Sequence, residues 1–167
     1  MCNSKNNFIL GLASLALLAD PEAQNLLKGK SADLSGYSVS FDQVAALFGS
    51  GSDRQIALEE FAKSVLRCLV KEGHELVTHY CKSKGLYSDL SAQPWWQFSR
   101  LIRNALSHDF CFRLKDKDAK LLPLSWQGKT IDESVDGQPL MLSFFGYADA
   151  WYLSLEYENF VLGLSSD

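Results

Sequence analysis

The segment Arg103-Asn104-Ala105-Leu106-Ser107-His108 places three polar side chains of chemical interest within six residues. An arginine guanidinium is always charged, and its planar fork can donate two parallel hydrogen bonds to a phosphate. Histidine has an unperturbed pKa of about 6.5, so it can both take and give a proton near neutrality. The combination of Arg103, Asn104 and His108 therefore indicates acid–base chemistry on a phosphodiester.

A regular helix would separate the two ends of this segment. Residues five apart differ by about 500°, or about 140° after a full turn, so Arg103 and His108 should not share a face. Two arrangements would bring them together. The helix could unwind near Ser107, so that His108 turns back, or two copies of the segment could meet across a twofold axis. Without either, the segment is a helix-end histidine beside a surface arginine.

The segment resembles the R-x(4–6)-H signature of the HEPN superfamily (higher eukaryotes and prokaryotes nucleotide-binding domains), here with the spacing R-x4-H. In that family a polar residue, often asparagine, commonly follows the arginine, as Asn104 does here. The family fold is an up-and-down helical bundle with the motif late in the bundle. The resemblance covers about residues 4–110 and the last helix, and a β excursion at about 112–145 departs from it.

The resemblance implies a metal-independent endoribonuclease that cleaves single-stranded RNA as a homodimer, often a toxin or stress effector with a cognate antitoxin protein. It implies that His108 is the general acid and base, that Arg103 binds and stabilises the scissile phosphate, and that Asn104 assists in positioning. The chemistry agrees, because the RNA 2′-hydroxyl must lose a proton and the leaving 5′-oxygen must gain one. Two imidazoles in a dimer supply both tasks, and arginine supplies a fixed cation. We expect no cofactor.

The motif lies in a locally basic zone. From Arg100 to Lys120 there are six Lys or Arg against three Asp, whereas after Lys129 there is no Lys or Arg and there are seven Asp or Glu. The candidates for an RNA-binding rim are Arg100, Arg113, Lys115 and Lys117. A solubilising surface has the same composition. The net charge of −4 argues against a general nucleic-acid coat, which needs many cations to displace counterions.

Two other clusters have less chemical promise. His74 and His79 are five residues apart, whereas the histidines of an HExxH zinc helix are four apart and share a face. We therefore expect no metal site, even with Cys81 nearby, and interpret both as partly exposed helix histidines. Trp95 and Trp96 could stack on RNA bases, but we expect Trp95 in the core and interpret Trp96 as a candidate dimer contact.

The bulk properties predict a single HEPN-like domain over residues 1–167, a length that suffices for a sizeable core. The composition, 47% hydrophobic and 22% charged, is ordinary for a soluble globular protein. The four cysteines form no CxxC pair, which favours reduced thiols and a cytoplasmic location. The apolar run 8–19 is too short to span a membrane and lacks a clear signal-peptide cleavage site. We expect a buried first helix and no membrane association.

The hydrophobic periodicity predicts a mainly α fold, an up-and-down bundle of four to five helices with a small β excursion before the last helix. The expected helices span residues 4–19, 21–28, 41–48, 53–83, 94–109 and 147–162. Short strands are expected at 112–114, 124–127 and 129–131, with turns at Gln127-Gly128 and Asp136-Gly137. In the helix 53–83, apolar residues recur at spacings close to three and four, which predicts that one face is buried; they are Ile56, Phe61, Val65, Leu69, Leu76 and Tyr80.

The patterns leave three hypotheses. The first is a HEPN-like ribonuclease, a hydrolase acting by the acid–base route above. The second is a non-catalytic HEPN-like module, in which the same polar segment joins a dimer or docks a partner. The third is an unrelated helical interaction domain. The chain contains no P-loop, GxGxxG or GxSxG pattern, so nucleotide hydrolases, dinucleotide enzymes and serine hydrolases have no support.

Overall fold

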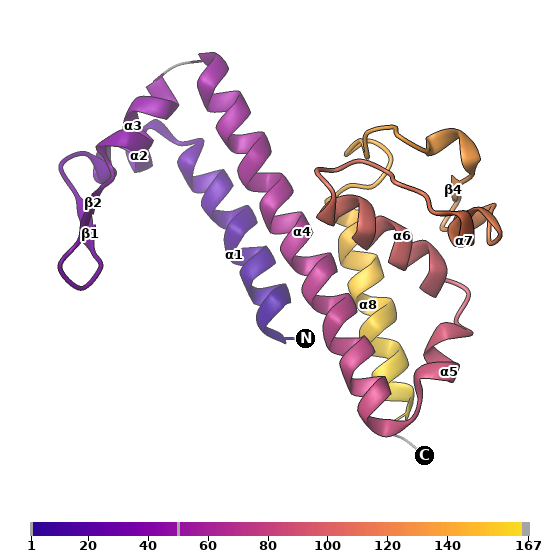
Figure 1. Cartoon of the computed structure of the whole chain (residues 1–167). Helices are drawn as coiled ribbons and strands as arrows, with labels where there is room; N and C mark the ends of the chain where they lie inside the picture. The colour runs from indigo at the N-terminus through magenta and orange to yellow at the C-terminus, as the bar shows by residue number, and fades with distance from the viewer. Residues whose placement is uncertain (1, 50, 165–167) are drawn as a thin grey trace. The chain divides into compact units, whose positions relative to one another are not determined.

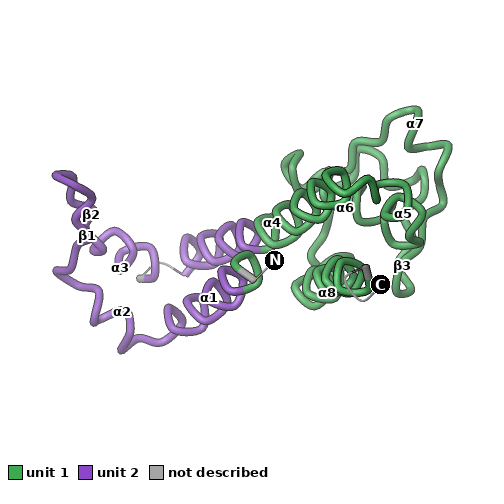
Figure 2. The backbone as a smooth tube through the Cα atoms, turned by 90° about the horizontal axis from the view of Figure 1, so that it is seen from below, with its two compact units in different colours: residues 1–5, 66–167 green, residues 6–65 purple. Residues whose placement is uncertain are grey.

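The computed structural model describes residues 2–49 and 51–164, and these residues form a mainly helical protein (Figure 1). The chain divides into two compact units, residues 1–5 with 66–167 and residues 6–65 (Figure 2). The elements in chain order are α1 (Cys2–Leu18), α2 (Pro21–Leu27), β1 (Ser31–Asp33), β2 (Ser38–Ser40), α3 (Asp42–Gly49), α4 (Gly51–Lys84), α5 (Tyr87–Ser91), α6 (Trp96–Ser107), α7 (Asp116–Ala119), β3 (Leu124–Trp126), β4 (Lys129–Ile131), the 3-10 helix η1 (Glu133–Val135) and α8 (Tyr147–Leu164).

Every helix expected from the sequence is present, with ends within about two residues of the prediction. Local signals explain this agreement. The Asp20 carboxylate accepts the amide of Glu22 at 2.8 Å and caps α2, which has Pro21 in its first turn. Gln127 and Gly128, with φ of 46° and 75°, form the tight turn that joins the antiparallel strands β3 and β4. The short elements β1, β2, α5 and α7 were not predicted.

The prediction of a strand at 112–114 is wrong. Phe112 donates to the carbonyl of Gln138 and accepts from the amide of Gly137, both at 2.9 Å, around an isolated bridge between Cys111 and Pro139. The Asp136 carboxylate then accepts the amide of Leu114 at 2.8 Å. This side-chain acceptor takes the hydrogen bond that a strand partner would need, so the pairing ends after one bridge.

In the unit of residues 6–65, α1 lies antiparallel to the first part of α4 (Figures 1 and 2). Gly11 of α1 permits the close approach, because a Cβ atom there would lie 2.7 Å from a methyl carbon of Val65. The expectation of a buried first helix is wrong, since Ile9, Leu10 and Leu17 are 52%, 64% and 64% exposed. A helix that is apolar nearly all round cannot bury every side against a single helix. Among the described residues, no helix combines the length and apolarity needed to cross a membrane.

The predicted buried face of α4 is only partly correct. Leu69 is fully buried, but Ile56, Phe61 and Leu76 are exposed. The helix carries two neighbouring apolar stripes. The stripe that contains Ile56, Phe61 and Leu76 is exposed, and a stripe offset from it by about one residue is buried. The buried positions are Ala62, Leu66, Leu69, Val70, Gly73, His74, Val77 and Cys81.

The core of the larger unit forms where α4, α6, α8 and the β3–β4 hairpin meet. Trp126 of β3 packs against Phe98 and Phe145 with ring centroids 5.6 and 6.4 Å apart. Trp95 and Trp96 are both buried, so the interpretation of Trp96 as a dimer contact is wrong. This aromatic core fixes α6, the helix that carries the motif.

Candidate active site

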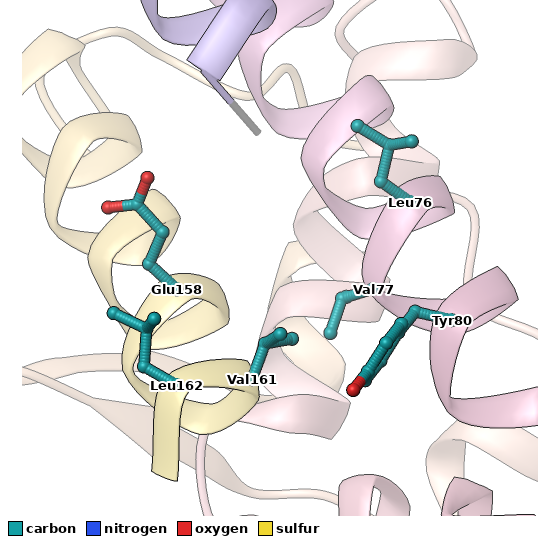
Figure 3. A pocket seen from close by; sticks show the side chains of 6 residues that line it. All are labelled: Leu76, Val77, Tyr80, Glu158, Val161 and Leu162. Carbon is teal, nitrogen blue, oxygen red and sulfur yellow. The ribbon is translucent and has the colours of Figure 1, made fainter. Parts of the chain in front are cut away.

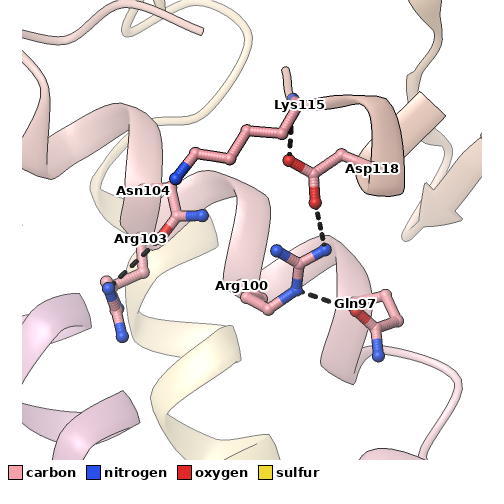
Figure 4. A network of polar contacts seen from close by, with 6 residues as sticks. All are labelled: Gln97, Arg100, Arg103, Asn104, Lys115 and Asp118. Carbon is pink, nitrogen blue, oxygen red and sulfur yellow. Dashed lines mark hydrogen bonds and ion pairs between the residues drawn. The ribbon is translucent and has the colours of Figure 1, made fainter. Parts of the chain in front are cut away.

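Helix α6 carries the first two motif residues, and Arg103 shares a side of the helix with the buried residues Trp96 and Ser99. The buried residues of α6 are Trp96, Phe98, Ser99, Leu101, Ile102, Ala105 and Leu106. Arg103 and Asn104 are half-buried, and the Arg103 Nη1 donates to the Asn104 Oδ1 at 3.1 Å (Figure 4). This hydrogen bond between neighbouring side chains limits the rotation of the guanidinium.

The chain leaves the helix at His108. Its φ of −116° and ψ of 62° are not helical, and its amide donates to the carbonyls of Asn104 and Ala105 at 3.1 Å. Asp109 and Phe110 then both adopt φ of 54°, a left-handed conformation that costs energy in residues with a Cβ atom. The result is an exposed imidazole directly after the helix end.

The structure brings together two of the three predicted catalytic residues. The backbone amide of His108 bonds to the carbonyl of Asn104, but among the described residues no side-chain hydrogen bond or ion pair joins the His108 imidazole to Arg103 or Asn104. The helix does end at Ser107, as the first of the two expected arrangements requires. The side-chain hydrogen bond of the motif therefore links Arg103 to Asn104 and does not include the His108 imidazole.

Arg100 of the expected RNA-binding rim has a partner within the chain. It donates to Gln97 at 2.9 Å and forms an ion pair with Asp118 at 2.7 Å (Figure 4). Asp118 is 1% exposed and also accepts the amide of Lys115 at 2.9 Å. Burial raises the pKa of the Asp118 carboxyl, but these hydrogen bonds and the Arg100 charge hold it below its ordinary value. The side chains of Arg113, Lys115 and Lys117 are exposed.

A buried histidine lies close to the motif, and the sequence reasoning missed it. His74 is 3% exposed, stacks on Trp96 at 4.4 Å and meets the edge of Tyr157 at 6.3 Å. Burial, followed by the charges of Arg103 and Arg100, lowers the pKa of His74 to about 3. The prediction that His74 is partly exposed is wrong, whereas His79 is exposed.

A sequence signal for the burial of His74 existed. His74 follows Val70 by four residues and precedes Val77 by three, so it occupies the buried stripe of α4. Its neutral imidazole acts as an aromatic core group, and its buried Nε2 has no hydrogen-bond partner among the residues that the structure describes.

A buried hydrogen bond ties α6 to α8. The hydroxyl oxygens of Ser99 and Tyr157 lie 2.6 Å apart, and both side chains are fully buried. Burial raises the pKa of the Tyr157 phenol, although the Ser99 hydrogen bond and the Arg103 charge oppose this. Tyr157 is therefore a neutral structural group, and its hydrogen bond to Ser99 fixes the position of α6 along α8.

A groove of about 360 Å³ opens between α4 and α8 (Figure 3). Its lining is Leu76, Val77, Tyr80, Glu158, Val161 and Leu162. Glu158 forms an ion pair with Lys5 at 2.7 Å, so its charge is neutralised. The groove contains no histidine or basic group and is not a site for phosphate chemistry. No group of three or more His, Cys, Asp or Glu in the described part of the chain could hold a metal ion.

No family model, curated protein or solved structure matches this chain.

Proposed function

We propose that this protein is a metal-independent endoribonuclease that cleaves single-stranded RNA and has a HEPN-like bundle. The observation that carries the proposal is the arrangement at the end of α6. A guanidinium oriented by Asn104 lies slightly more than one turn before an exposed imidazole. This combination offers an anion-binding group and a proton-transfer group to one phosphodiester.

The reaction follows from those two groups. One imidazole takes the proton of the RNA 2′-hydroxyl, and the 2′-oxygen forms a bond to the adjacent phosphorus. The bond from phosphorus to the 5′-oxygen breaks, and the leaving oxygen takes a proton from a second imidazole. The Arg103 guanidinium stabilises the negative charge on the non-bridging oxygens. The products are a 2′,3′-cyclic phosphate and a 5′-hydroxyl, with no change of oxidation state and no metal.

The need for two imidazoles supports a homodimer as the active form. Each chain contributes a single His108 after its helix, and a twofold axis would supply the second copy. In this proposal the protein is a cytoplasmic toxin or stress effector that a cognate antitoxin protein restrains. Arg113 and Lys115, both exposed, would contact the RNA backbone beyond the scissile phosphate.

A second candidate function is a non-catalytic dimerisation or partner-binding module. The observation that favours it is the partial burial of Arg103, whose buried Nε has no hydrogen-bond partner in the described part of the chain. Its charge also affects the buried groups of His74 and Tyr157. An arginine used only to organise the helix interface would have the same surroundings.

An assay of RNA cleavage in EDTA distinguishes the two functions. We expect the purified protein to cut single-stranded RNA and leave 2′,3′-cyclic phosphate ends. Substitution His108→Ala should lower the rate by about 10²-fold or more, because it removes both proton-transfer groups of a dimer. His79→Ala, a change at another exposed histidine, is the matched control and should keep wild-type activity.

Two results would contradict the proposal that this protein is a ribonuclease. Cleavage that persists in the His108→Ala protein would point to a contaminant or another site. Intact RNA with the wild-type protein, together with loss of self-association in Arg103→Ala measured by sedimentation, would instead support the binding module.

A further inference from the structure

A buried carboxylate connects two segments that carry cations. Asp118 of α7 is 1% exposed, and its two oxygens have different partners. Its Oδ1 accepts from the Nη2 of Arg100 on α6 at 2.7 Å, and its Oδ2 accepts the amide of Lys115 at 2.9 Å (Figure 4). One side chain therefore attaches the residue before α7 to the helix that carries the motif.

The backbone of Lys115 is held on both sides of its side chain. Its carbonyl accepts the amides of Asp118 and Ala119 at 2.7 and 3.1 Å. The amide of the preceding residue, Leu114, donates to the Asp136 carboxylate at 2.8 Å. The Lys115 side chain itself is exposed. An ammonium that can reach a ligand therefore extends from a backbone of fixed position.

The ion pair between Arg100 and Asp118 attaches Lys115 close to the motif. Arg100 precedes Arg103 and Asn104 by three and four residues, so these side chains are neighbours on the surface of α6, about one turn or 5.4 Å apart along its axis. The flexible four-carbon stem of a lysine can span about one such turn. Figure 4 shows the Lys115 side chain extending from the start of α7 toward Asn104. Its ammonium is therefore directed to the part of α6 that carries the motif.

The buried ion pair provides geometry more than stability. A buried pair gains little over an apolar pair, because both charges lose their hydration. A guanidinium and a carboxylate bind each other in few orientations, and the Arg100 Nε also donates to Gln97 at 2.9 Å. A cation on an ordered backbone loses less entropy when it binds an anion. The arrangement favours phosphate binding by Lys115 over binding by Arg100, whose charge Asp118 compensates.

From this arrangement we infer that Asp118 and Arg100 are positioning residues for Lys115, whose ammonium binds the RNA phosphate next to the one that is cleaved. This inference rests on the proposed function, because RNA is the phosphate ligand which that function requires. It gives Arg100 a role different from the direct RNA contact expected from the sequence, since its guanidinium acts through the Asp118 carboxylate.

The first test is binding of a fluorescein-labelled single-stranded RNA whose 2′-hydroxyls are all methylated, so that it cannot be cut. Anisotropy is measured in EDTA over a range of salt concentrations. Lys115→Gln should weaken binding about fivefold or more and lower the slope of log K against log salt by about 0.7, the value for one lost phosphate contact on a single strand. The matched control is Lys120→Gln, an exposed lysine at the other end of α7, which should keep the wild-type slope.

The second test separates positioning from direct contact. Loss of a negative charge in Asp118→Asn would by electrostatics alone strengthen RNA binding, whereas loss of positioning should weaken it and lower the slope as Lys115→Gln does. In a Lys115→Gln background, neither Asp118→Asn nor Arg100→Gln should lower the slope further, because the positioned cation is already absent. Circular dichroism verifies that each variant is folded, and Arg100→Gln serves alone if Asp118→Asn is not.

Four results would overturn the inference. They are a wild-type slope in Lys115→Gln, an equal loss of slope in Lys120→Gln, tighter binding by Asp118→Asn, and a further loss of about 0.7 when Arg100→Gln is added to Lys115→Gln, which would show that Arg100 contacts a phosphate directly. If the methylated RNA binds through Lys115 as expected but natural RNA stays intact, only the ribonuclease proposal fails.

Discussion

His74 illustrates how one buried polar side chain links stability to pH. The stacking on Trp96 and the edge contact with Tyr157 use the imidazole as an aromatic ring. Protonation would place a cation in a buried site that already lies near Arg103 and Arg100. The folded protein therefore requires this histidine to be neutral.

We predict a pH-dependent stability that depends on His74. An unfolded histidine titrates near pH 6.5, whereas burial lowers the folded pKa to about 3. Between these values the unfolded state binds more protons, so this contribution to stability is present above about pH 6.5 and is lost as the pH falls toward 3. The slope should approach about 1.4 kcal/mol per pH unit. His74→Phe should reduce it in urea titrations from pH 4 to 7.

The control for this measurement is His79→Gln, which changes the exposed histidine on the same helix. It should retain the wild-type slope. A His74→Phe protein with an unchanged pH dependence would show that other groups cause the acid sensitivity.

The packing of α1 on α4 depends on a single missing side chain. Gly11 brings the two helices close in the unit of residues 6–65, where its position faces the Val65 methyl groups. Helix propensity alone would favour alanine over glycine there. Close packing has the larger effect, because a β-branched side chain has little freedom to move aside.

We predict opposite effects for the same substitution in two helices. Gly11→Ala should destabilise the protein by about 1–3 kcal/mol, because the new Cβ would lie 2.7 and 2.9 Å from Val65 methyl carbons. Gly163→Ala in α8 should stabilise it by up to about 1 kcal/mol, because nothing lies within 4 Å of its Cβ. Urea unfolding followed by circular dichroism measures both. A stabilising Gly11→Ala would refute the packing argument.

The whole molecule has one motif histidine per chain, so the proposed chemistry depends on assembly. If each active site needs His108 from both chains, an inactive chain should inactivate the partner with which it pairs. Independent monomers would show no such effect.

We therefore predict that excess His108→Ala protein inhibits the wild-type enzyme. After subunit exchange with a tenfold excess, RNA cleavage per wild-type chain should fall to about a tenth, because most wild-type chains then pair with a variant. The same excess of His79→Ala protein should increase total cleavage. Activity that is unaffected by the His108→Ala protein would exclude a shared active site.

Sequence patterns predicted α1, α2, α3, α4, α6 and α8 because the signals of these helices are local. Asp20 and Pro21 mark the start of α2, and apolar spacing predicted α4, α6 and α8. The same patterns identified Arg103, Asn104 and His108, since a motif is a set of neighbours along the chain. The prediction of a strand at 112–114 failed because the backbone amide of Leu114 donates to the side chain of Asp136, 22 residues away.

The three-dimensional fold alone determined which polar groups are compensated. Residue types show that Arg100 and Asp118 carry opposite charges, but only packing brings these two residues, 18 positions apart, into an ion pair. Packing also selected the stripe of α4 that became buried, and with it the neutral state of His74. The physical reason is that charge compensation and desolvation depend on distances through space, which the spacing of residues along a chain does not specify.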